Sequence, residues 1–199
     1  MQTTPVVTAL RKAGRDRVAV ELDGTPWRVL PAESVVAAGL DAGVSLDRER
    51  VRRLRAELRR VEARSAALSA LRHRDHTATT LRSRLAAKGV APIDREAAIV
   101  TMERAGLVDD ARFAQGRASA LAARGAGDLM IQDDLERRGV APALVDEAIG
   151  RLEPELERAR RLLAGHPDWR RALRRLAAKG FAEDALEAVV ADQREAELG

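Results

Sequence analysis

The sequence predicts a mainly α-helical protein with a small β-containing cap at its amino terminus. Three observations carry this prediction: strand-like alternation is confined to residues 5–30, amphipathic helical patterns fill the chain after Ser45, and one helix-ending motif occurs three times. Repeated units of this kind bury their apolar faces by stacking on one another. The expected architecture is therefore an elongated curved rod of tandem three-helix repeats.

The amino-terminal segment carries the strand signal. Val18, Val20 and Leu22 recur at every second position, and Asp23-Gly24 is typical of a two-residue hairpin turn. Pro31 is expected to open a short helix that ends near Gly39. Residues 1–46 are therefore predicted to form a small sheet with one helix, too small to be an independent domain.

Residues 47–73 predict one long helix. An apolar stripe with alternating spacings of three and four is expected along it, and its members are Val51, Leu54, Leu58, Val61, Ser65 and Leu68. The opposite surface is expected to carry Arg48, Arg50, Arg52, Arg53, Arg55, Arg59, Arg60 and Arg64. Glu49, Glu57 and Glu62 are interleaved with these arginines, so the run is interpreted as a solvated face rather than a strong binding surface.

A helix-ending motif is repeated at 81–92 (LRSRLAAKGVAP), 131–142 (IQDDLERRGVAP) and 173–184 (LRRLAAKGFAED). Gly89, Gly139 and Gly180 each follow a cationic residue, where glycine closes a helix in the left-handed conformation. Such a cap also needs an apolar contact across the glycine, and the expected pairs are Leu85/Val90, Leu135/Val140 and Leu176/Phe181. The glycines are offset by 139 − 89 = 50 and 180 − 139 = 41 residues.

These offsets place the remaining helices and divide the chain. Helices are expected near 77–88, 92–105, 109–124, 128–138, 142–152, 155–164, 168–179 and 183–195. The predicted parts are the cap (1–46), the long helix with the first repeat (47–106), the second repeat (107–153) and the third repeat (154–199).

Composition disfavours several classes of function. Without cysteine, the chain has no disulfide framework, thiol nucleophile or cysteine zinc site. An aromatic content of 2% disfavours folds that stack bases on exposed rings. No apolar run approaches the ~20 residues of a membrane span and no leader is recognisable, so a cytoplasmic protein is expected. The net charge is 35 − 31 = +4, and arginine supplies nearly all of the cations, which favours a polyanionic partner.

Paired carboxylates lie between the first and second repeats, at Asp109 and Asp110. They fit either an acid–base or Mg²⁺ site, or a structural role in which Asp109 caps the next helix and Asp110 lies in the dipole field of its first turn. The structural role is favoured, and Phe113 is expected in the core.

Metal and cofactor sites are not predicted. His73 and His76 lie three residues apart, but the third histidine, His166, is distant and no cysteine is present. No nucleotide-binding glycine loop and no nucleophile motif occurs. The sequence therefore predicts no catalytic residue, no metal and no cofactor.

The third repeat carries the most one-sided basic surface. Over residues 158–179 the charge is 8 − 1 = +7, with Asp168 as the acid and Arg158, Arg160, Arg161, Arg170, Arg171, Arg174, Arg175 and Lys179 as the cations. Trp169, Leu173 and Leu176 fall on the other side of the helix at 100° per residue. The guanidinium groups are expected to point away from the core and to bind a polyanion or an acidic partner.

The chain also resembles a known family. The segments ALRHRDHTATTLRSRLAAKGV, GLVDDARFA at 106–114 and LMIQDDLERRGV are similar to the RecX family of regulators of the RecA recombinase, over roughly residues 5–192. The resemblance implies a regulator that is not an enzyme and that acts by stoichiometric binding to the filament RecA forms on single-stranded DNA. It implies damping of strand exchange, ATP hydrolysis and the co-protease activity that drives the DNA-damage response.

The site prediction combines this resemblance with the charge pattern. The expected motif residues are Gly106, Leu107, Asp109, Asp110, Phe113, Gly89, Gly139 and Gly180. The expected contacts with RecA, or with single-stranded DNA directly or through the filament, are Arg82, Arg84, Arg112, Arg158, Arg161, Arg170, Arg171, Arg174, Arg175 and Lys179. A monomer is expected. Two alternatives stay open: a helical-repeat nucleic-acid-binding protein without a recombinase target, and a scaffold for another protein.

Overall fold

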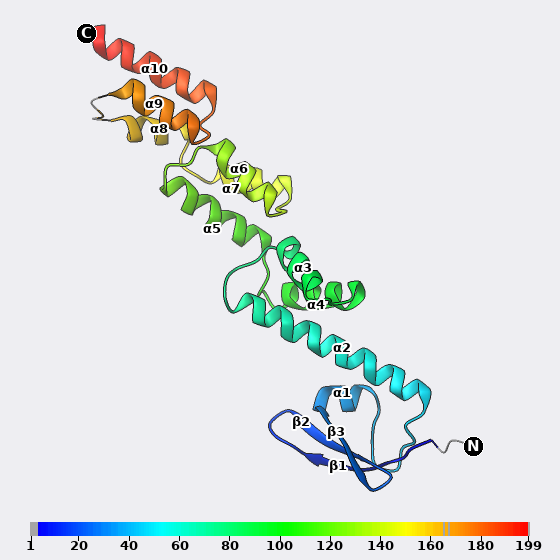
Figure 1. Ribbon diagram of the computed structural model, residues 1–199. Helices are drawn as coiled ribbons and strands as arrows, with labels where there is room; N and C mark the ends of the chain where they lie inside the picture. Colours follow the sequence, from blue (N-terminus) through cyan, green and yellow to red (C-terminus); the bar gives the residue numbers. More distant parts are fainter. Residues whose placement is uncertain (1–3, 165, 167, 199) are drawn as a thin grey trace. The chain divides into compact units, whose positions relative to one another are not determined.

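A computed structural model describes residues 4–164, 166 and 168–198 (Figure 1). The amino-terminal elements are the strands β1 (Val7–Lys12), β2 (Arg17–Leu22) and β3 (Thr25–Pro31), followed by the helices α1 (Ala32–Ala37) and α2 (Arg48–Leu71). The later helices are α3 (Ala78–Ala87), α4 (Pro92–Arg104), α5 (Asp110–Ala123), α6 (Asp128–Arg137), α7 (Pro142–Gly150), α8 (Glu155–Leu163), α9 (Trp169–Ala178) and α10 (Glu183–Leu198). The mainly helical fold with a small amino-terminal sheet is confirmed.

The chain divides into two compact units. The first comprises Met1–His73 and Arg84–Arg104, and the second comprises Arg74–Ser83 and Ala105–Gly199. Helix α3 contributes its first residues to the second unit and the rest to the first.

The amino-terminal sheet is antiparallel with the strand order β1-β2-β3. Leu22 pairs with Thr25 across a two-residue turn in which Asp23 and Gly24 have φ of 50° and 75°. Positive φ at both central residues is what a type I′ hairpin requires. The hairpin predicted from Asp23-Gly24 is therefore confirmed.

The sheet does not have a hydrophobic core of its own. Its buried residues Val7, Val20 and Leu30 form one cluster with residues of α1 and with Leu54 of α2. In Figure 1, α1 lies between the sheet and α2. The first half of α2 therefore completes the core of the cap, as expected for a segment too small to fold alone.

Helix α2 is buried on opposite sides in its two halves. In the first half, Leu54 is buried in the core of the cap, whereas in the second half Ala63, Ala67 and Ala70 are buried. From Leu54 to Ala63 is 63 − 54 = 9 residues, which is about two and a half turns and reverses the buried side.

The predicted continuation of the apolar stripe to Ser65 and Leu68 is wrong. Ser65 is exposed and Leu68 is 44% exposed. The reason is that α4 packs against α2 on the side that carries the buried alanines. Methyl side chains allow this close approach between two helices, and the larger leucine stays on the open side.

The second and third repeats each enclose an apolar cluster. In the second, Ala114 and Ala118 of α5 pack with Ile131 and Leu135 of α6 and with Val145 of α7. The third has a corresponding cluster, formed by Ala159, Leu163, Ala172, Leu176, Phe181 and Val189. Small residues on the first helix of each repeat let the other two helices pack closely on it.

The predicted glycine caps are present. Gly89, Gly139 and Gly180 have φ of 77°, 71° and 79°. In each cap the amide that follows the glycine bonds back to the carbonyl five residues earlier: Val90 to Leu85 at 3.1 Å, Val140 to Leu135 at 3.2 Å and Phe181 to Leu176 at 3.2 Å. This is the Schellman geometry that the repeated motif predicts.

Within the second unit, the second helices of successive repeats meet end to end. Where α6 ends, the carbonyls of Arg138 and Gly139 accept hydrogen bonds from the hydroxyls of Thr77 (2.7 Å) and Thr79 (3.3 Å) at the start of α3. Where α9 ends, the carbonyls of Lys179 and Gly180 accept from the amides of Gly127 (2.9 Å) and Leu129 (3.1 Å) at the start of α6.

The two junctions use equivalent positions. Thr77 and Gly127 differ by 127 − 77 = 50 residues, and Arg138 and Lys179 differ by 179 − 138 = 41, the same offsets as the glycine caps. Each junction satisfies carbonyls that a helix end leaves without partners and places a carboxyl-terminal dipole end on an amino-terminal one.

A carboxylate closes each junction. Asp110, the first residue of α5, accepts a hydrogen bond from the amide of Ala78 at 2.8 Å. Glu155, the first residue of α8, accepts from the amide of Asp128 and also from the amide of Ala182 at 3.1 Å. Asp110 lies in the first turn of α5 as predicted, and its carboxylate also caps α3, the second helix of the preceding repeat.

Replacing Thr77 with valine tests the junction. Thr77 is fully buried and its hydroxyl also accepts from the amide of Thr80 at 3.0 Å. Valine keeps the shape but leaves these groups without partners, so the free energy of unfolding should fall by about 1–3 kcal/mol. Thr79→Val is the matched control, since Thr79 is exposed and its bond is weaker. Thermal unfolding of both variants measures the difference, and equal midpoints would contradict the assigned role.

Candidate functional site

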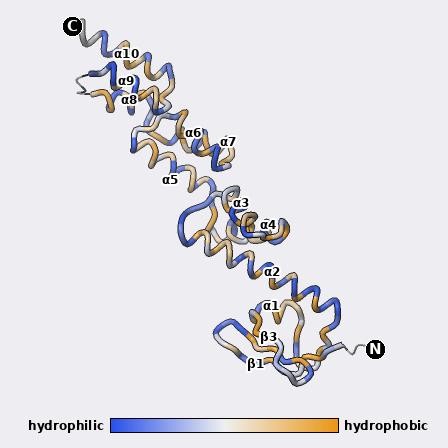
Figure 2. Tube along the Cα trace, viewed as in Figure 1, coloured by the Kyte–Doolittle hydropathy of each residue, from blue (hydrophilic) through white to orange (hydrophobic). Residues whose placement is uncertain are grey.

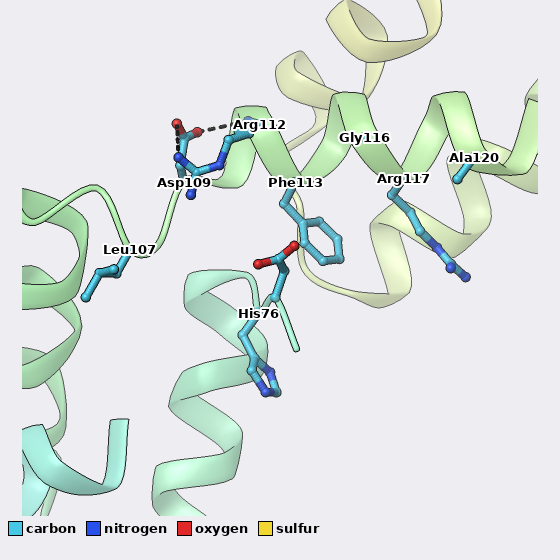
Figure 3. Close-up of a pocket in the computed structure, with 9 residues that line it drawn as sticks. His76, Leu107, Asp109, Arg112, Phe113, Gly116, Arg117 and Ala120 are labelled. Atoms are coloured by element: carbon cyan, nitrogen blue, oxygen red, sulfur yellow. Dashed lines mark hydrogen bonds and ion pairs between the residues drawn. The ribbon is translucent and has the colours of Figure 1, made fainter. Parts of the chain in front are cut away.

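The predicted motif segment lines a cavity in the second unit (Figure 3). The cavity has a volume of about 340 Å³ and lies between α5 and the residues that precede α3. Phe113 projects from α5 and is half-buried, and His76 is 5% exposed on the facing segment. Leu107, in contrast, is 45% exposed at the edge of the motif.

Two charged residues of this cavity, Asp109 and Arg112, interact with each other. Asp109 is the N-cap of α5 and accepts from the amide of Arg112 at 2.9 Å, which confirms the predicted cap. The Arg112 side chain, 62% exposed, donates to the carbonyl of Gly106 at 3.0 Å and lies 3.9 Å from the Asp109 carboxylate. Arg112 therefore holds the motif in shape and still presents much of its guanidinium to solvent.

The cavity does not present an acid–base pair. Asp109 is used as a cap, and His76 has its Nδ1 atom 3.3 Å from the hydroxyl of Thr80. The other lining residues include neither a serine nor a lysine that could act as a nucleophile. Among the residues that the structure describes, no group of three or more histidines and carboxylates could hold a metal ion.

A half-buried ion network stabilises the second repeat beside the cavity. The Asp134 carboxylate accepts from Arg117 (Nε at 2.8 Å and Nη2 at 2.9 Å) and from Nε of Arg138 at 2.8 Å. The guanidinium of Arg117, and then that of Arg138, hold the pKa of Asp134 well below its usual range. The same interaction raises the pKa of Arg117.

Helix α9 presents an exposed basic surface, which we call the α9 basic face and define as Arg170, Arg171, Arg174 and Arg175. All four are exposed, while Ala172 and Leu176 on the other side of the helix are buried. The Arg170 guanidinium lies 5.0 Å from the centre of the Trp169 ring. Within the described part of the chain, none of the four side chains forms an ion pair. In Figure 2, hydrophilic and hydrophobic stretches alternate along this helix.

Arg158 does not belong to this surface, and its prediction as a partner contact is wrong. It is 3% exposed, and its guanidinium donates to the carbonyls of Ala126 at 2.8 Å and Glu153 at 2.9 Å and pairs with Asp128. The reason is its register: Arg158 occupies in α8 the core-facing place that Phe113 occupies in α5, since 158 − 113 = 45 and the buried alanines that follow differ by 159 − 114 = 45.

The remaining cations of residues 158–179 are engaged within the chain. Arg161 is exposed and pairs with Glu153. Hydrogen bonds to Asp192 and Glu157 raise the pKa of Arg160. The Lys179 ammonium donates to the carbonyl of Arg124 at 3.1 Å, across the junction of the second and third repeats. The arginines of α8 therefore differ from those of the α9 basic face, because they pair with carboxylates.

The two arginines predicted on α3 fall in different units. Arg82 belongs to the second unit and is half-buried, whereas Arg84 belongs to the first and is exposed in the last turn of α3. The structure does not place either of them on the α9 basic face.

Helix α2, in the first unit, carries a second basic surface, within the run of arginines that the sequence analysis interprets as a solvated face. We call it the α2 arginine stripe and define it as Arg48, Arg52 and Arg55. All three are exposed and line one hollow together with Arg59. Of the glutamates that are interleaved with them in the sequence, Glu49 pairs with Arg53 and Glu57 pairs with Arg60. In the sequence, the spacings of 4 and 3 residues between these three arginines indicate that they share one face of the helix.

Comparison with family models identifies the second repeat. Residues 109–149 match the model described as "RecX, second three-helix domain". The match begins at the N-cap of α5 and ends within α7.

Several curated proteins are similar to the chain. The "Regulatory protein RecX" of Halorhodospira halophila is 35% identical over 138 residues, which cover 64% of this chain and 86% of that protein. The "Regulatory protein RecX" of Chromohalobacter salexigens is 36% identical over 118 residues, 59% of this chain and 69% of that protein.

Solved structures show the same fold. A crystal structure of regulatory protein RecX superimposes with a TM-score of 0.79 at 19% identity and covers 92% of this chain and 97% of that one. RecX from Lactobacillus salivarius superimposes with a TM-score of 0.58 at 16% identity and covers 67% of this chain and 96% of that one.

Among the helices that the structure describes, none combines the length and the hydrophobicity that a membrane span needs.

The Asp134 network predicts a loss of stability in acid. A carboxyl whose pKa is lowered by folding stabilises the native state above its unfolded pKa of about 3.9, and that contribution disappears as the pH falls through the folded value. Asp134→Asn should therefore lower the free energy of unfolding at pH 7 by about 1–3 kcal/mol, and the deficit should shrink below about pH 4. Urea unfolding of the parent and the variant at a series of pH values measures this difference in the free energy of unfolding.

Asp133→Asn is the control for this measurement. Asp133 pairs with Arg137 on the surface, with side chains 62% and 69% exposed. Exposed pairs contribute about 0–1 kcal/mol, so this variant should unfold nearly as the parent does. If the two variants behave alike, Asp134 does not have the role assigned to it.

Proposed function

Because the chain belongs to the RecX family of regulatory proteins, we propose that it binds the filament that RecA forms on single-stranded DNA and restrains its activities. The observation that carries the proposal is the α9 basic face, whose four arginines are exposed and have no carboxylate partner among the described residues. The action is stoichiometric: the protein occupies a surface of the filament and hinders its growth and turnover.

The chemistry of this face suits a polyanionic assembly. Arginine keeps its charge at all physiological pH values and binds phosphates and carboxylates through a planar fork of donors. A filament built on DNA offers a regular array of phosphates, and acidic side chains of a protein offer similar acceptors. Among the described residues, no carboxylate pairs with the α9 guanidinium groups. Their positive charge can therefore attract such a partner.

A nucleic-acid-binding protein without a recombinase target is the second candidate. It is supported by the α2 arginine stripe, which is a second set of unpaired cations on a separate unit. The two functions differ in whether binding to single-stranded DNA requires RecA. Pull-down of RecA with and without single-stranded DNA and a non-hydrolysable nucleotide separates filament binding from binding to DNA alone.

Charge reversal of the α9 basic face tests the proposal. Because Arg170, Arg171, Arg174 and Arg175 lie opposite the buried side of α9, their replacement by Glu should leave helix content and folding intact. Repulsion should then weaken binding to the RecA–DNA filament. The parent protein should lower ATP hydrolysis by RecA on single-stranded DNA, and the quadruple variant should lower it much less at the same concentration.

A second quadruple variant controls for net charge. Arg104, Arg124, Arg137 and Arg151 are exposed on other helices, and their replacement by Glu changes the net charge by the same amount. This variant should inhibit nearly as the parent does. Equal inhibition by the parent and a folded α9 variant would remove the α9 basic face from the contact surface.

Regulation by binding also predicts that the purified protein has no activity of its own. Nuclease, ATPase and protease assays with and without Mg²⁺ should show no turnover, since both motif carboxylates cap helices. Turnover that co-purifies with the protein and disappears in the Asp109→Asn/Asp110→Asn variant would contradict this expectation. Circular dichroism of that variant shows whether the loss comes from the site or from unfolding.

A further inference from the structure

We propose that the α2 arginine stripe binds the phosphate backbone of single-stranded DNA directly. The inference deepens the proposed function, on which it rests for the identity of the polyanion. It assigns a DNA contact to the first unit, apart from the α9 basic face of the second unit.

The three guanidinium groups of the stripe are free, although the helix is rich in acids. The other arginines of this surface pair with carboxylates, in the pairs Arg50–Asp47, Arg53–Glu49, Arg60–Glu57 and Arg64–Glu33. Among the described residues, no carboxylate pairs with Arg48, Arg52 or Arg55. The arginines of α2 therefore divide into a neutralised side and the stripe, and Glu62 lies exposed beyond Arg59, at the far end of the stripe side.

The stripe borders a hollow without negative charge. Its volume is about 580 Å³, and it is lined by four arginines together with Leu46, Val51 and Ala56. The cavity beside α5 differs, because Asp75 and Asp109 line it along with two arginines. Of these two hollows, the one on α2 has the electrostatic character that an anion requires.

The spacing of the arginines suits a row of phosphates. They are separated by 52 − 48 = 4 and 55 − 52 = 3 residues, which corresponds to about 6 Å and 4.5 Å along the helix axis. The next position in the row, Arg59, donates to the Asp94 carboxylate at 3.2 Å, and Asp94 is 5% exposed. Arg59 is thereby neutralised at the end of the row, which leaves three charges for a ligand.

A single strand fits this surface better than a duplex. A helix that enters the major groove needs to be open on several sides, because the groove is about 12 Å wide and has phosphates at both edges. The first half of α2 is covered by the cap, where Leu54 is buried. One row of cations on one open side can follow one backbone.

An acidic protein segment fits less well, because the hollow offers no apolar anchor. Leu46 is 6% exposed and belongs to the core of the cap, and Val51 packs against the same core. Protein interfaces draw most of their binding energy from buried aromatic and aliphatic anchors. A ligand that depends on charge alone is expected here, and a phosphate backbone is such a ligand.

Salt dependence of DNA binding tests the inference without RecA. The full-length parent, the stripe variant Arg48→Gln/Arg52→Gln/Arg55→Gln and the control Arg50→Gln/Arg53→Gln/Arg60→Gln are titrated against fluorescently labelled oligo(dT) at 50–200 mM salt. The two variants lose the same charge from the same helix, and glutamine preserves helix propensity. Fluorescence anisotropy gives the affinity.

The stripe variant should lose three phosphate contacts. The slope of log K against log salt should therefore become less steep by about 2, at about 0.7 per contact on a single strand. Between 50 and 200 mM salt, the parent should therefore lose about 20-fold more affinity than the stripe variant loses. The control should retain the slope of the parent. A slope in the stripe variant equal to that of the parent, or an equal reduction in both variants, would overturn the inference.

Two further arms test the choice of ligand. The affinities for duplex DNA and for poly-glutamate should fall less in the stripe variant than the affinity for oligo(dT) does. An equal or greater fall for either ligand would overturn the assignment to a single strand. Circular dichroism checks folding, and the single variant Arg52→Gln, with an expected slope change of about 0.7, serves if the triple variant unfolds. Because no RecA is present, failure to inhibit RecA and failure to bind DNA are separate results.

Discussion

The head-to-tail contact between the second helices of successive repeats is the interaction on which the second unit depends. An isolated helix leaves four amides and four carbonyls without partners at its ends. Here the carbonyls after α6 and α9 are satisfied by donors at the starts of α3 and α6, at 2.7–3.3 Å. Asp110 and Glu155 satisfy further amides at the same ends. Each repeat therefore completes the hydrogen bonding of the one before it.

The same contact explains why glycine ends the second helices of the second and third repeats. A Cβ atom on Gly139 would lie 2.5 Å from Cγ2 of Thr79, and one on Gly180 would lie 2.6 Å from the amide nitrogen of Met130. The two glycines thus serve both a left-handed cap and a close approach between repeats. The sequence indicates the first role through the pattern that follows each helix. It does not indicate the second, because close approach depends on residues 50 or more positions away.

The helices, the hairpin and the caps were predictable because they depend on local patterns. The site was less predictable, because charge counting does not show which face a side chain occupies. Arg158 was counted as a surface cation, although aligning α8 with α5 places it where Phe113 is half-buried. The reversal of the buried side along α2 was hidden for a related reason: it is caused by the separate packing of the cap and of α4 on one helix.

Ion pairing within the fold determines where positive charge remains available. A net charge of +4 on 199 residues is small. Among the residues that the structure describes, carboxylates nevertheless pair with most arginines of α2 and α8, and none pairs with the α2 arginine stripe or the α9 basic face. Glu49 and Glu57 illustrate this, since each binds an arginine on its own helix, three or four residues away, and neither pairs with a member of the stripe. Local charge, and not the net charge of the chain, decides where a polyanion is attracted. Each of the two surfaces lies on a helix with its own buried side and in its own compact unit, so the charge of either can be changed while the core behind it keeps its packing.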